Sequence, residues 1–243
     1  MNKLLTGKTA LVTGAAKRIG KAIALALAAN GANVAITYLG SQAEAEATVH
    51  ALADLDVDAF AVRCDLRDPE SILQMVSAVH AEFGQLDLLV NNAGTFAAAA
   101  LEAISVDQWD AMFATNTRAP FLVAKAAYPY LRAAGGRIVN IGSLGGVHPW
   151  ATHAHYCTSK AALHMLSQTM AKAWAPEISV NCIAPGMIVQ SNEVDEAYEH
   201  FARKTPMQRN GTAEDVAAAA VFFATAPHFI TGQLLAVDGG LGL

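Results

Sequence analysis

Residues 9–20 have the sequence TALVTGAAKRIG, an apolar run of strand length that passes through a turn at Gly14 into a segment of helix length. In such a turn, the backbone N–H groups and the N-terminus of the following helix can face a pyrophosphate. A tight connection between a strand and a helix would use the same glycines. The turn therefore indicates a nucleotide site only if the same unit recurs along the chain.

The strand and helix unit recurs from one end of the chain to the other. Apolar strands are predicted at residues 9–13, 34–38, 59–63, 87–91, 137–141, 179–183 and 234–237. Helices are predicted at about 19–30, 42–55, 69–83, 106–132, 156–175 and 213–226. This alternation is typical of the α/β class. It predicts a single domain over residues 1–243, built on a Rossmann-type, doubly wound parallel sheet of seven strands, with ligands at the carboxyl ends of the strands.

One segment, residues 187–209, departs from this pattern. It is long and charged, and it shows no clear period. Long irregular segments inside a compact domain are commonly lids or binding loops. We therefore expect residues 187–209 to form a substrate lid over the active site.

The bulk composition narrows the class of protein. Hydrophobic residues make up 53% of the 243 residues and charged residues 15%, which suits one well-buried core. The net charge is −5 and no basic run could follow a phosphate backbone, so nucleic acid is not an expected partner. Because the first residues resemble neither a secretory signal nor a membrane span, we expect a cytoplasmic protein with no membrane partner.

The cysteines and histidines do not indicate a metal centre. The three cysteines are odd in number and lack the CxxC spacing of zinc sites, so we expect Cys64 and Cys182 to be buried and Cys157 to line a pocket or pack against a helix. Residues 148–155 include three histidines and a tryptophan, but no acid or cysteine completes a ligand set. This segment is predicted to line the substrate pocket, and no metal is expected.

Tyr156 and Lys160 lie one turn apart on a predicted helix and therefore share one of its faces. An ammonium beside the phenol would favour its ionised form and lower a pKa that starts near ~10. The order of motifs strengthens the prediction, because the pair follows the glycine turn, the NNAG stretch at 91–94, Asn116 and Ser143. Each of these lies at the carboxyl end of a strand or faces it, so we expect them to meet at one edge of the sheet.

These motifs together are those of a known family. In order, the chain carries TGAAKRIG, Asp65, NNAG, Asn116, Ser143, YCTSK, Pro185-Gly186 and VDGG at 237–240. With these motifs it resembles the short-chain dehydrogenase/reductase family over essentially its whole length. The resemblance implies that Tyr156 is the general acid or base and that Lys160 holds the nicotinamide ribose. It also implies that Ser143 hydrogen-bonds the substrate oxygen and that Asn116 positions a water for proton relay.

The same resemblance implies where a dinucleotide cofactor binds. The residues that it assigns to the cofactor lie in the glycine turn, at the ends of the central strands, on the catalytic helix and after the sixth strand. They are Gly14, Lys17, Arg18, Ile19, Gly20, Tyr38, Ser41, Asp65, Leu66, Asn92, Ala93, Gly94, Tyr156, Lys160, Pro185, Gly186 and Ile188.

The end of the second strand indicates which cofactor is preferred. A carboxylate there would pair with a ribose 2′-hydroxyl and repel a 2′-phosphate, but residues 37–41 are TYLGS. The glycine turn carries Lys17, where family members that prefer the phosphorylated cofactor often have a base. Leu39 stands near a position where the family often has an arginine, so Ser41 would have to help bind the phosphate. The sequence therefore predicts NADP(H) as the cofactor.

Arg18 replaces the middle glycine of the family's TGxxxGxG turn, and this makes the turn similar to that of pteridine reductases. In those enzymes the arginine lies by the pyrophosphate and reaches the bound pterin. The chain differs from the parasite-type pteridine reductases in keeping Ser143, where they often have Asp, and in having NNAG rather than NNAS. Substrate class is thus open between a pterin-like molecule and another small carbonyl compound.

Three functions are weighed on these residues. The first is an NADPH-dependent oxidoreductase that transfers hydride to a small carbonyl or pterin-like substrate, with Tyr156 as the proton donor. The second is a 3-oxoacyl-carrier-protein reductase, favoured by the GG-containing tail and residues 205–209 (TPMQR). The third is a dinucleotide-sensing module without activity, although a sensor has no need of a proton donor. The family resemblance also implies a homotetramer, with the helix of Tyr156 and the C-terminal segment among its contacts.

Overall fold

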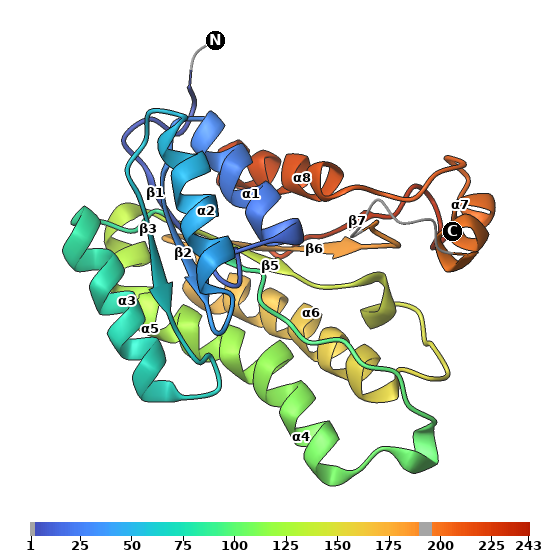
Figure 1. Cartoon of the computed structure of the whole chain (residues 1–243). Helices are drawn as coiled ribbons and strands as arrows, with labels where there is room; N and C mark the ends of the chain where they lie inside the picture. The colour runs from blue at the N-terminus through green and yellow to red at the C-terminus, as the bar shows by residue number, and fades with distance from the viewer. Residues whose placement is uncertain (1–2, 190–195) are drawn as a thin grey trace.

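The computed structural model describes residues 3–189 and 196–243, and it is built on one sheet of seven parallel strands. The strands are β1 (Thr9–Val12), β2 (Asn33–Tyr38), β3 (Ala59–Arg63), β4 (Leu88–Asn91), β5 (Arg137–Ile141), β6 (Ser179–Pro185) and β7 (Leu234–Val237). Their order in space is β3-β2-β1-β4-β5-β6-β7 (Figure 1). The strand order reverses between β1 and β4, which is the point where doubly wound sheets bind ligands. The predicted fold class is confirmed.

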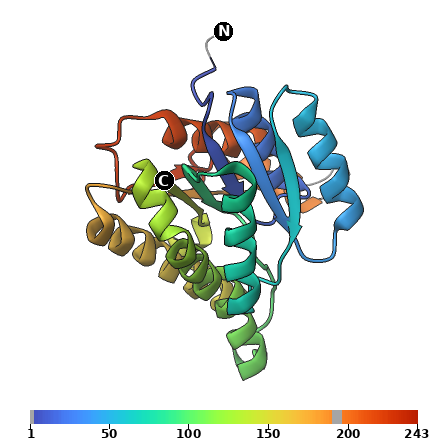
Figure 2. The ribbon, with the colours of Figure 1, turned by 90° about the vertical axis from the view of Figure 1, so that its left-hand side faces the viewer.

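Helices cover both faces of this sheet (Figures 1 and 2). One face is covered by α1 (Arg18–Ala29), α2 (Gln42–Ala53) and α8 (Ala213–Thr225). The other is covered by α3 (Pro69–Phe83), α5 (Ala119–Ala134) and α6 (Ala154–Trp174). Along β1, Ala10 and Val12 pack into the first core and Leu11 into the second, because successive strand side chains point to opposite faces. In the described part of the chain, no helix is both long and apolar enough to cross a membrane.

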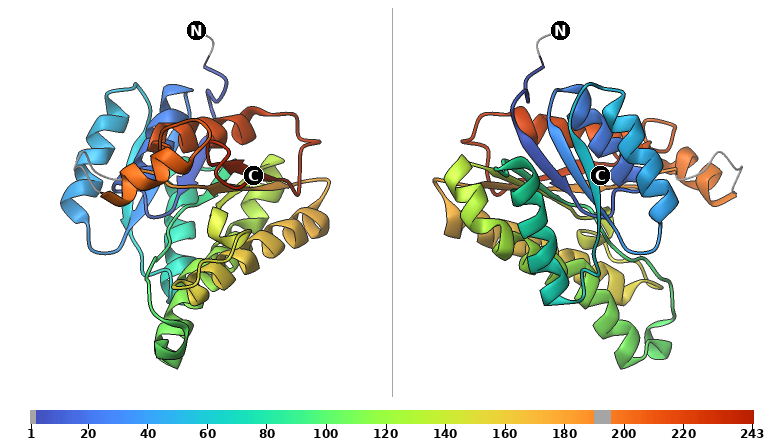
Figure 3. Two further views of the ribbon diagram at one scale, coloured as in Figure 1. Left: turned by 90° about the vertical axis from the view of Figure 1, so that its right-hand side faces the viewer. Right: turned by 60° about the vertical axis from the view of Figure 1, so that its left-hand side comes forward.

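The long helix predicted at 106–132 has an interruption that the sequence pattern does not show. It consists of α4 (Val106–Phe113), a π-helical turn at Ala114–Arg118 and then α5. Ser105 and Gln108 form a capping box that begins α4, and Gly135, with a φ of 59°, ends α5. Figure 3 shows α4 extending away from the body of the molecule. Single π-turns inside α-helices are frequent at functional sites, and this one contains Asn116.

The segment predicted as an irregular lid, residues 187–209, is only partly irregular. Residues 196–204 form helix α7 (Glu196–Lys204), and residues 190–195 lie outside the described part of the chain. Glu196 and Glu199 in the first turn and Arg203 and Lys204 in the last turn suit the helix dipole, and Glu199 pairs with Arg203 at 3.7 Å. The prediction of an irregular segment was therefore wrong here. In Figure 1, α7 lies beyond the carboxyl end of β6.

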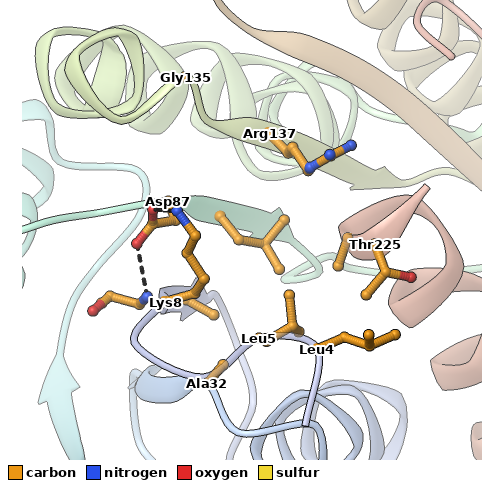
Figure 4. Close-up of a pocket in the computed structure, with 12 residues that line it drawn as sticks. Leu4, Leu5, Lys8, Ala32, Asp87, Gly135, Arg137 and Thr225 are labelled. Carbon is orange, nitrogen blue, oxygen red and sulfur yellow. Dashed lines mark hydrogen bonds and ion pairs between the residues drawn. The ribbon is translucent and has the colours of Figure 1, made fainter. Parts of the chain in front are cut away.

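The opposite edge of the sheet, at the amino ends of the strands, is held by Asp87. Its carboxylate accepts the backbone N–H of Thr9 at 2.9 Å and the ammonium of Lys8 at 2.8 Å. These residues line a cavity of about 260 Å³, which Figure 4 shows together with Leu5 and Arg137. Because ligands of this fold bind at the carboxyl ends of the strands, we assign this cavity to packing at the base of the sheet.

Asp87 supplies a test of this arrangement. Thr9 is 1% exposed, so Asp87→Ala leaves a buried N–H group without its acceptor, and we expect the free energy of unfolding to fall by about 1–3 kcal/mol. Lys8→Ala removes only a half-exposed ion pair and should cost at most about 1 kcal/mol. Urea denaturation of both variants measures the difference. Equal losses would show that the ion pair, and not the buried N–H, is what the carboxylate stabilises.

Candidate active site

The turn between β1 and α1 lies directly against the loop that follows β4. A Cβ atom built at Gly14 would lie 2.9 Å from the Cα of Ala93, and one at Gly20 would lie 2.7 Å from the carbonyl oxygen of Gly14. Gly14 has a φ of 63°, which glycine adopts without strain. Side chains at these two positions would push the turn away from the loop after β4 and from the start of α1. The turn therefore fits the close approach of a pyrophosphate.

Asn92 holds these two loops together. Its side chain donates to the carbonyl oxygens of Thr13 at 2.9 Å and Gly14 at 3.1 Å. The hydroxyl of Thr13 in turn accepts the backbone N–H groups of Asn92 at 3.0 Å and Ala93 at 3.1 Å. Asn92 was predicted to bind the cofactor. In the structure its amide group shapes the turn on which a cofactor would lie.

Lys17 and Arg18 are both exposed at the start of α1. Arg18 has a φ of 56°, an unusual value for any residue other than glycine. Such strained residues persist where the surrounding structure fixes them, commonly at ligand sites. The first turn of α1 has no acidic residue, so no side chain of that turn offsets the positive end of the helix dipole.

Asn116, in the π-turn, is completely buried. Its amide accepts the backbone N–H of Thr95 at 2.8 Å, donates to the carbonyl of Thr95 at 2.9 Å and donates to the hydroxyl of Ser159 at 3.1 Å. These partners, Thr95 and Ser159, lie outside the helix of Asn116. Its side chain joins α6 to the loop after β4.

Gly94, Asn116 and Lys160 are brought together as the sequence predicted. A Cβ atom at Gly94 would lie 3.2 Å from Asn116 Oδ1 and 3.4 Å from Lys160 Nζ. The ammonium of Lys160 donates to the carbonyl oxygen of Ile141, at the end of β5, at 2.8 Å. Burial lowers the pKa of Lys160 to about 8. This lysine thus ends at the carboxyl edge of the sheet, beside the NNAG loop.

The hydroxyl of Ser143 lies close enough to the side chain of Tyr156 to influence the pKa of that phenol. Ser143 is 4% exposed, and its Oγ also accepts the backbone N–H of Gly145 at 3.0 Å. The sequence predicted that Lys160 would lower the pKa of Tyr156, but burial raises it above its ordinary value, and the Ser143 hydroxyl offsets only part of that rise. The physical reason is that the ring is desolvated while the ammonium is engaged by Ile141.

Three aromatic rings surround Tyr156, and we call Phe96, Trp150 and His153 the aromatic wall. Phe96 meets the ring of Tyr156 edge-on at 4.8 Å and stacks on His153 at 4.7 Å. Trp150 lies nearly parallel to Tyr156 at 6.0 Å. Trp150 and His153 were predicted to line the pocket, whereas Phe96 was missed. The sequence feature that could have indicated Phe96 is the presence of an aromatic residue two positions after the NNAG motif.

The end of β2 carries a cation that the sequence did not place there. Tyr38 pairs with Arg63 in the parallel register of β2 and β3, and Arg63 Nε donates to the carbonyl of Leu39 at 3.2 Å. The Arg63 side chain therefore lies next to Leu39. This is near the position where the family often has an arginine and where the sequence of this chain has none. Lys17 was predicted to favour the phosphorylated cofactor. Its Nζ lies 3.4 Å from Oε1 of Glu44, on α2, in an exposed ion pair.

The remaining predicted cofactor residues lie along the same edge. Asp65 is paired with Arg67 at 2.7 Å, and this arginine lowers the pKa of its carboxyl group to about 2. Gly186 is pressed against Asp238, where a Cβ atom would lie 2.7 Å from that residue's Cβ. The others lie at or after the ends of strands, or pack against the hydrophobic cores. They are Ile19, Tyr38, Ser41, Leu66, Pro185 and Ile188.

Nothing in the described residues forms a cluster of three or more histidine, cysteine or acidic side chains suited to a metal ion. Cys64, Cys157 and Cys182 are free and buried, and burial was predicted for Cys64 and Cys182. Burial raises the pKa of Cys182 to about 11, so this thiol is protonated beneath the site.

Known proteins are similar to this chain in both sequence and fold. A family model described as Enoyl-(Acyl carrier protein) reductase matches residues 14–242. A 3-oxoacyl-[acyl-carrier-protein] reductase FabG from Staphylococcus aureus is 37% identical over 240 residues, covering 96% of this chain and 98% of the relative.

Two solved structures show the same arrangement in three dimensions. A short chain dehydrogenase from Burkholderia cenocepacia in complex with NADP is 41% identical, with a TM-score of 0.92 over 98% of this chain and 99% of that one. A blue fluorescent protein from a metagenomic library, in complex with NADPH, is 34% identical, with a TM-score of 0.93 over the whole of both chains. Since the family model and these relatives span nearly the whole sequence, the chain belongs to the short-chain dehydrogenase/reductase family of oxidoreductases.

Proposed function

We propose that this protein is an NADPH-dependent reductase of a small carbonyl or imine compound, with Tyr156 as its proton donor. The observation that carries the proposal is that Ser143, Tyr156 and Lys160 lie together at the carboxyl edge of the sheet. Bound NADPH supplies a hydride to the substrate carbon. The negative charge that develops on the substrate oxygen or nitrogen needs a proton, and the phenol of Tyr156 donates it while the Ser143 hydroxyl fixes that atom's position.

The protonation state of Tyr156 supports a donor role. A phenol has an ordinary pKa near ~10, so it keeps its proton at neutral pH and can give it to the substrate. Lys160 would hold the nicotinamide ribose, and the Gly14 turn with Asn92 behind it would hold the pyrophosphate. The intact set of Asn116, Ser143, Tyr156 and Lys160 supports an enzyme over a dinucleotide sensor.

Tyr156→Phe tests the mechanism directly. The change keeps the ring and its contacts with the aromatic wall but removes the proton, so kcat should fall at least about a hundredfold. The affinity for NADPH, followed by its fluorescence on titration, should stay nearly the same. A variant with near-normal turnover would refute the assignment of Tyr156.

Preference for NADPH over NADH is supported by two exposed cations and by the NADP-bound and NADPH-bound relatives. Lys17 precedes α1 and Arg63 ends β3, so they approach the end of β2 from two sides. The ion pair between Lys17 and Glu44 is half-exposed and therefore weak. A 2′-phosphate would compete with Glu44 for this ammonium.

Replacing Lys17 by Ala should erode the preference about tenfold or more. The expected cost of losing one charge-assisted phosphate contact is on the order of 1.5–3 kcal/mol. Glu44→Gln is the matched control: it releases Lys17 and should leave the preference intact or increase it. The measurement is kcat/KM with each cofactor. Equal or better efficiency of the parent enzyme with NADH would show that these cations do not serve a 2′-phosphate.

Of the two substrate classes left open by the sequence, we propose the pterin-like one, a planar, hydrogen-bonding molecule such as a dihydropterin. The aromatic wall presents ring faces and edges beside the Tyr156 hydroxyl, a surface that favours a flat ring. Arg18, which is part of the glycine turn, has a planar guanidinium with five N–H donors. We propose that this guanidinium bridges the cofactor phosphates and the polar edge of the substrate.

Arg18→Gly tests that bridge. Gly adopts a φ of 56° without strain, so the variant keeps the turn and any loss reflects the side chain. We expect kcat/KM for a dihydropterin to fall at least about tenfold further than kcat/KM for a diketone, which corresponds to about 1.4 kcal/mol. If both substrates respond alike, or the parent enzyme reduces no pterin, Arg18 serves only the cofactor.

A second candidate function is a 3-oxoacyl-carrier-protein reductase. The Staphylococcus aureus relative carries that name. In the structure the tail singled out for this function packs on residues 205–207: the backbone N–H of Met207 donates to the carbonyl of Gly239 at 3.2 Å, and a Cβ atom at Gly240 would lie 3.0 Å from Pro206. An acetoacetyl thioester included among the substrates above distinguishes the two functions.

We also propose that residues 187–209 act as a substrate lid and that the enzyme is a homotetramer. Within the described part of this segment, α7 is tied to the loop that precedes α8 by Asn210, whose amide donates to the carbonyl of Tyr198 at 2.7 Å. Large apolar side chains are exposed on α6, where Met165 is 63% exposed, and near the C-terminus, where Phe229 is 99% exposed. Contacts between subunits would cover these side chains.

A further inference from the structure

His164 lies behind the active site, on α6 one turn beyond Lys160, and it is 8% exposed. The proposed mechanism makes no use of it. Its ring occupies space that two glycines leave open in the segment after β5. A Cβ atom at Gly142 would lie 2.7 Å from His164 Cδ2, and one at Gly146 would lie 2.5 Å from Cε1. The imidazole is therefore fitted between the two glycines that flank Ser143.

The ring contacts the backbone at both ends of the Ser143 turn. Nε2 accepts the backbone N–H of Ser143 at 3.3 Å, and the ring also lies against Gly146, whose backbone affects the pKa of the ring. A neutral imidazole has one acceptor and one donor, which suits these two contacts. Burial, with a smaller effect from the neighbouring Lys160, lowers the pKa of His164 to about 4, so the ring is neutral at physiological pH.

Lys160 and His164 together hold the end of β5. They lie on one face of α6 and bind successive parts of the same backbone. The Lys160 ammonium donates to the carbonyl of Ile141, and the His164 ring accepts the N–H of Ser143. Downstream, Ser143 Oγ accepts the N–H of Gly145 and meets the Tyr156 side chain. The direction of the catalytic hydroxyl thus depends on the backbone that His164 fixes.

We propose that His164 is a positioning residue of this active site, which holds the backbone of residues 143–146 so that the Ser143 hydroxyl meets both Tyr156 and the substrate oxygen. The inference rests on the proposed function, in which Ser143 orients the substrate. Supporting groups of this kind matter because displacement of a reacting group by about 1 Å can cost on the order of a hundredfold in rate.

The test combines His164→Leu, His164→Gln, Ser143→Ala and the Ser143→Ala/His164→Leu double variant. His164→Leu should lower kcat at least about tenfold and leave the affinity for NADPH within about twofold, because His164 is buried and is not one of the residues assigned to the cofactor. His164→Gln should recover most of kcat, since its amide oxygen can accept the Ser143 N–H. In the Ser143→Ala background, His164→Leu should change kcat less than about twofold.

Three results would overturn the proposal: unchanged kcat in His164→Leu, the same factor of loss in both backgrounds, or a folded His164→Gln that is as slow as the Leu variant. Thermal unfolding by circular dichroism establishes which variants are folded. Should His164→Leu not fold, His164→Asn takes its place, because its amide is one bond shorter and does not reach Ser143. Parental kcat in Ser143→Ala would instead refute the role of Ser143 in the proposed function, which separates the two failures.

Discussion

The backbone contact between the β1–α1 turn and the loop after β4 is the constraint on which the site depends. Thr13 and Asn92 exchange hydrogen bonds across this contact, and Gly14 leaves no room for any side chain between the loops. From there the contacts pass through Gly94 to Asn116 and Lys160 and so to the ends of β4 and β5. The anion-binding turn and the proton donor are therefore parts of one packed layer at the edge of the sheet, and their spacing is set by backbone geometry.

Charges at this edge act in two different environments. The pairs Lys17–Glu44 and Arg67–Asp65 lie in solvent, where such pairs contribute about 0–1 kcal/mol and rearrange easily when an anion arrives. Lys160 and Tyr156 lie where desolvation dominates. Burial lowers the pKa of the lysine and raises that of the tyrosine, so each is shifted toward its neutral form. The exposed groups suit electrostatic binding and the buried ones suit proton transfer.

The sequence predicted the sheet, and most of the site, because both follow from local patterns. Strands buried on both faces show as apolar runs, and each motif stands at a strand end. The residues that were missed depend on tertiary contacts. Arg63 reaches Leu39 through strand register, and His164 lies on the same helix face as Lys160 but points to a turn distant in sequence. The direction of the Tyr156 pKa shift could not be predicted either, since it depends on how much solvent the aromatic wall removes.

The π-turn at Ala114–Arg118 limits how this chain can change in length. A π-turn accommodates one residue more than an α-helix of the same rise, and each helical residue turns the chain by about 100°. Deleting a single residue there would restore a regular helix and remove the widened turn that contains Asn116. Asn116, now completely buried, would lose its place between α6 and the NNAG loop. Insertions and deletions should therefore be tolerated in the projecting segment before α4 far more readily than within these few residues.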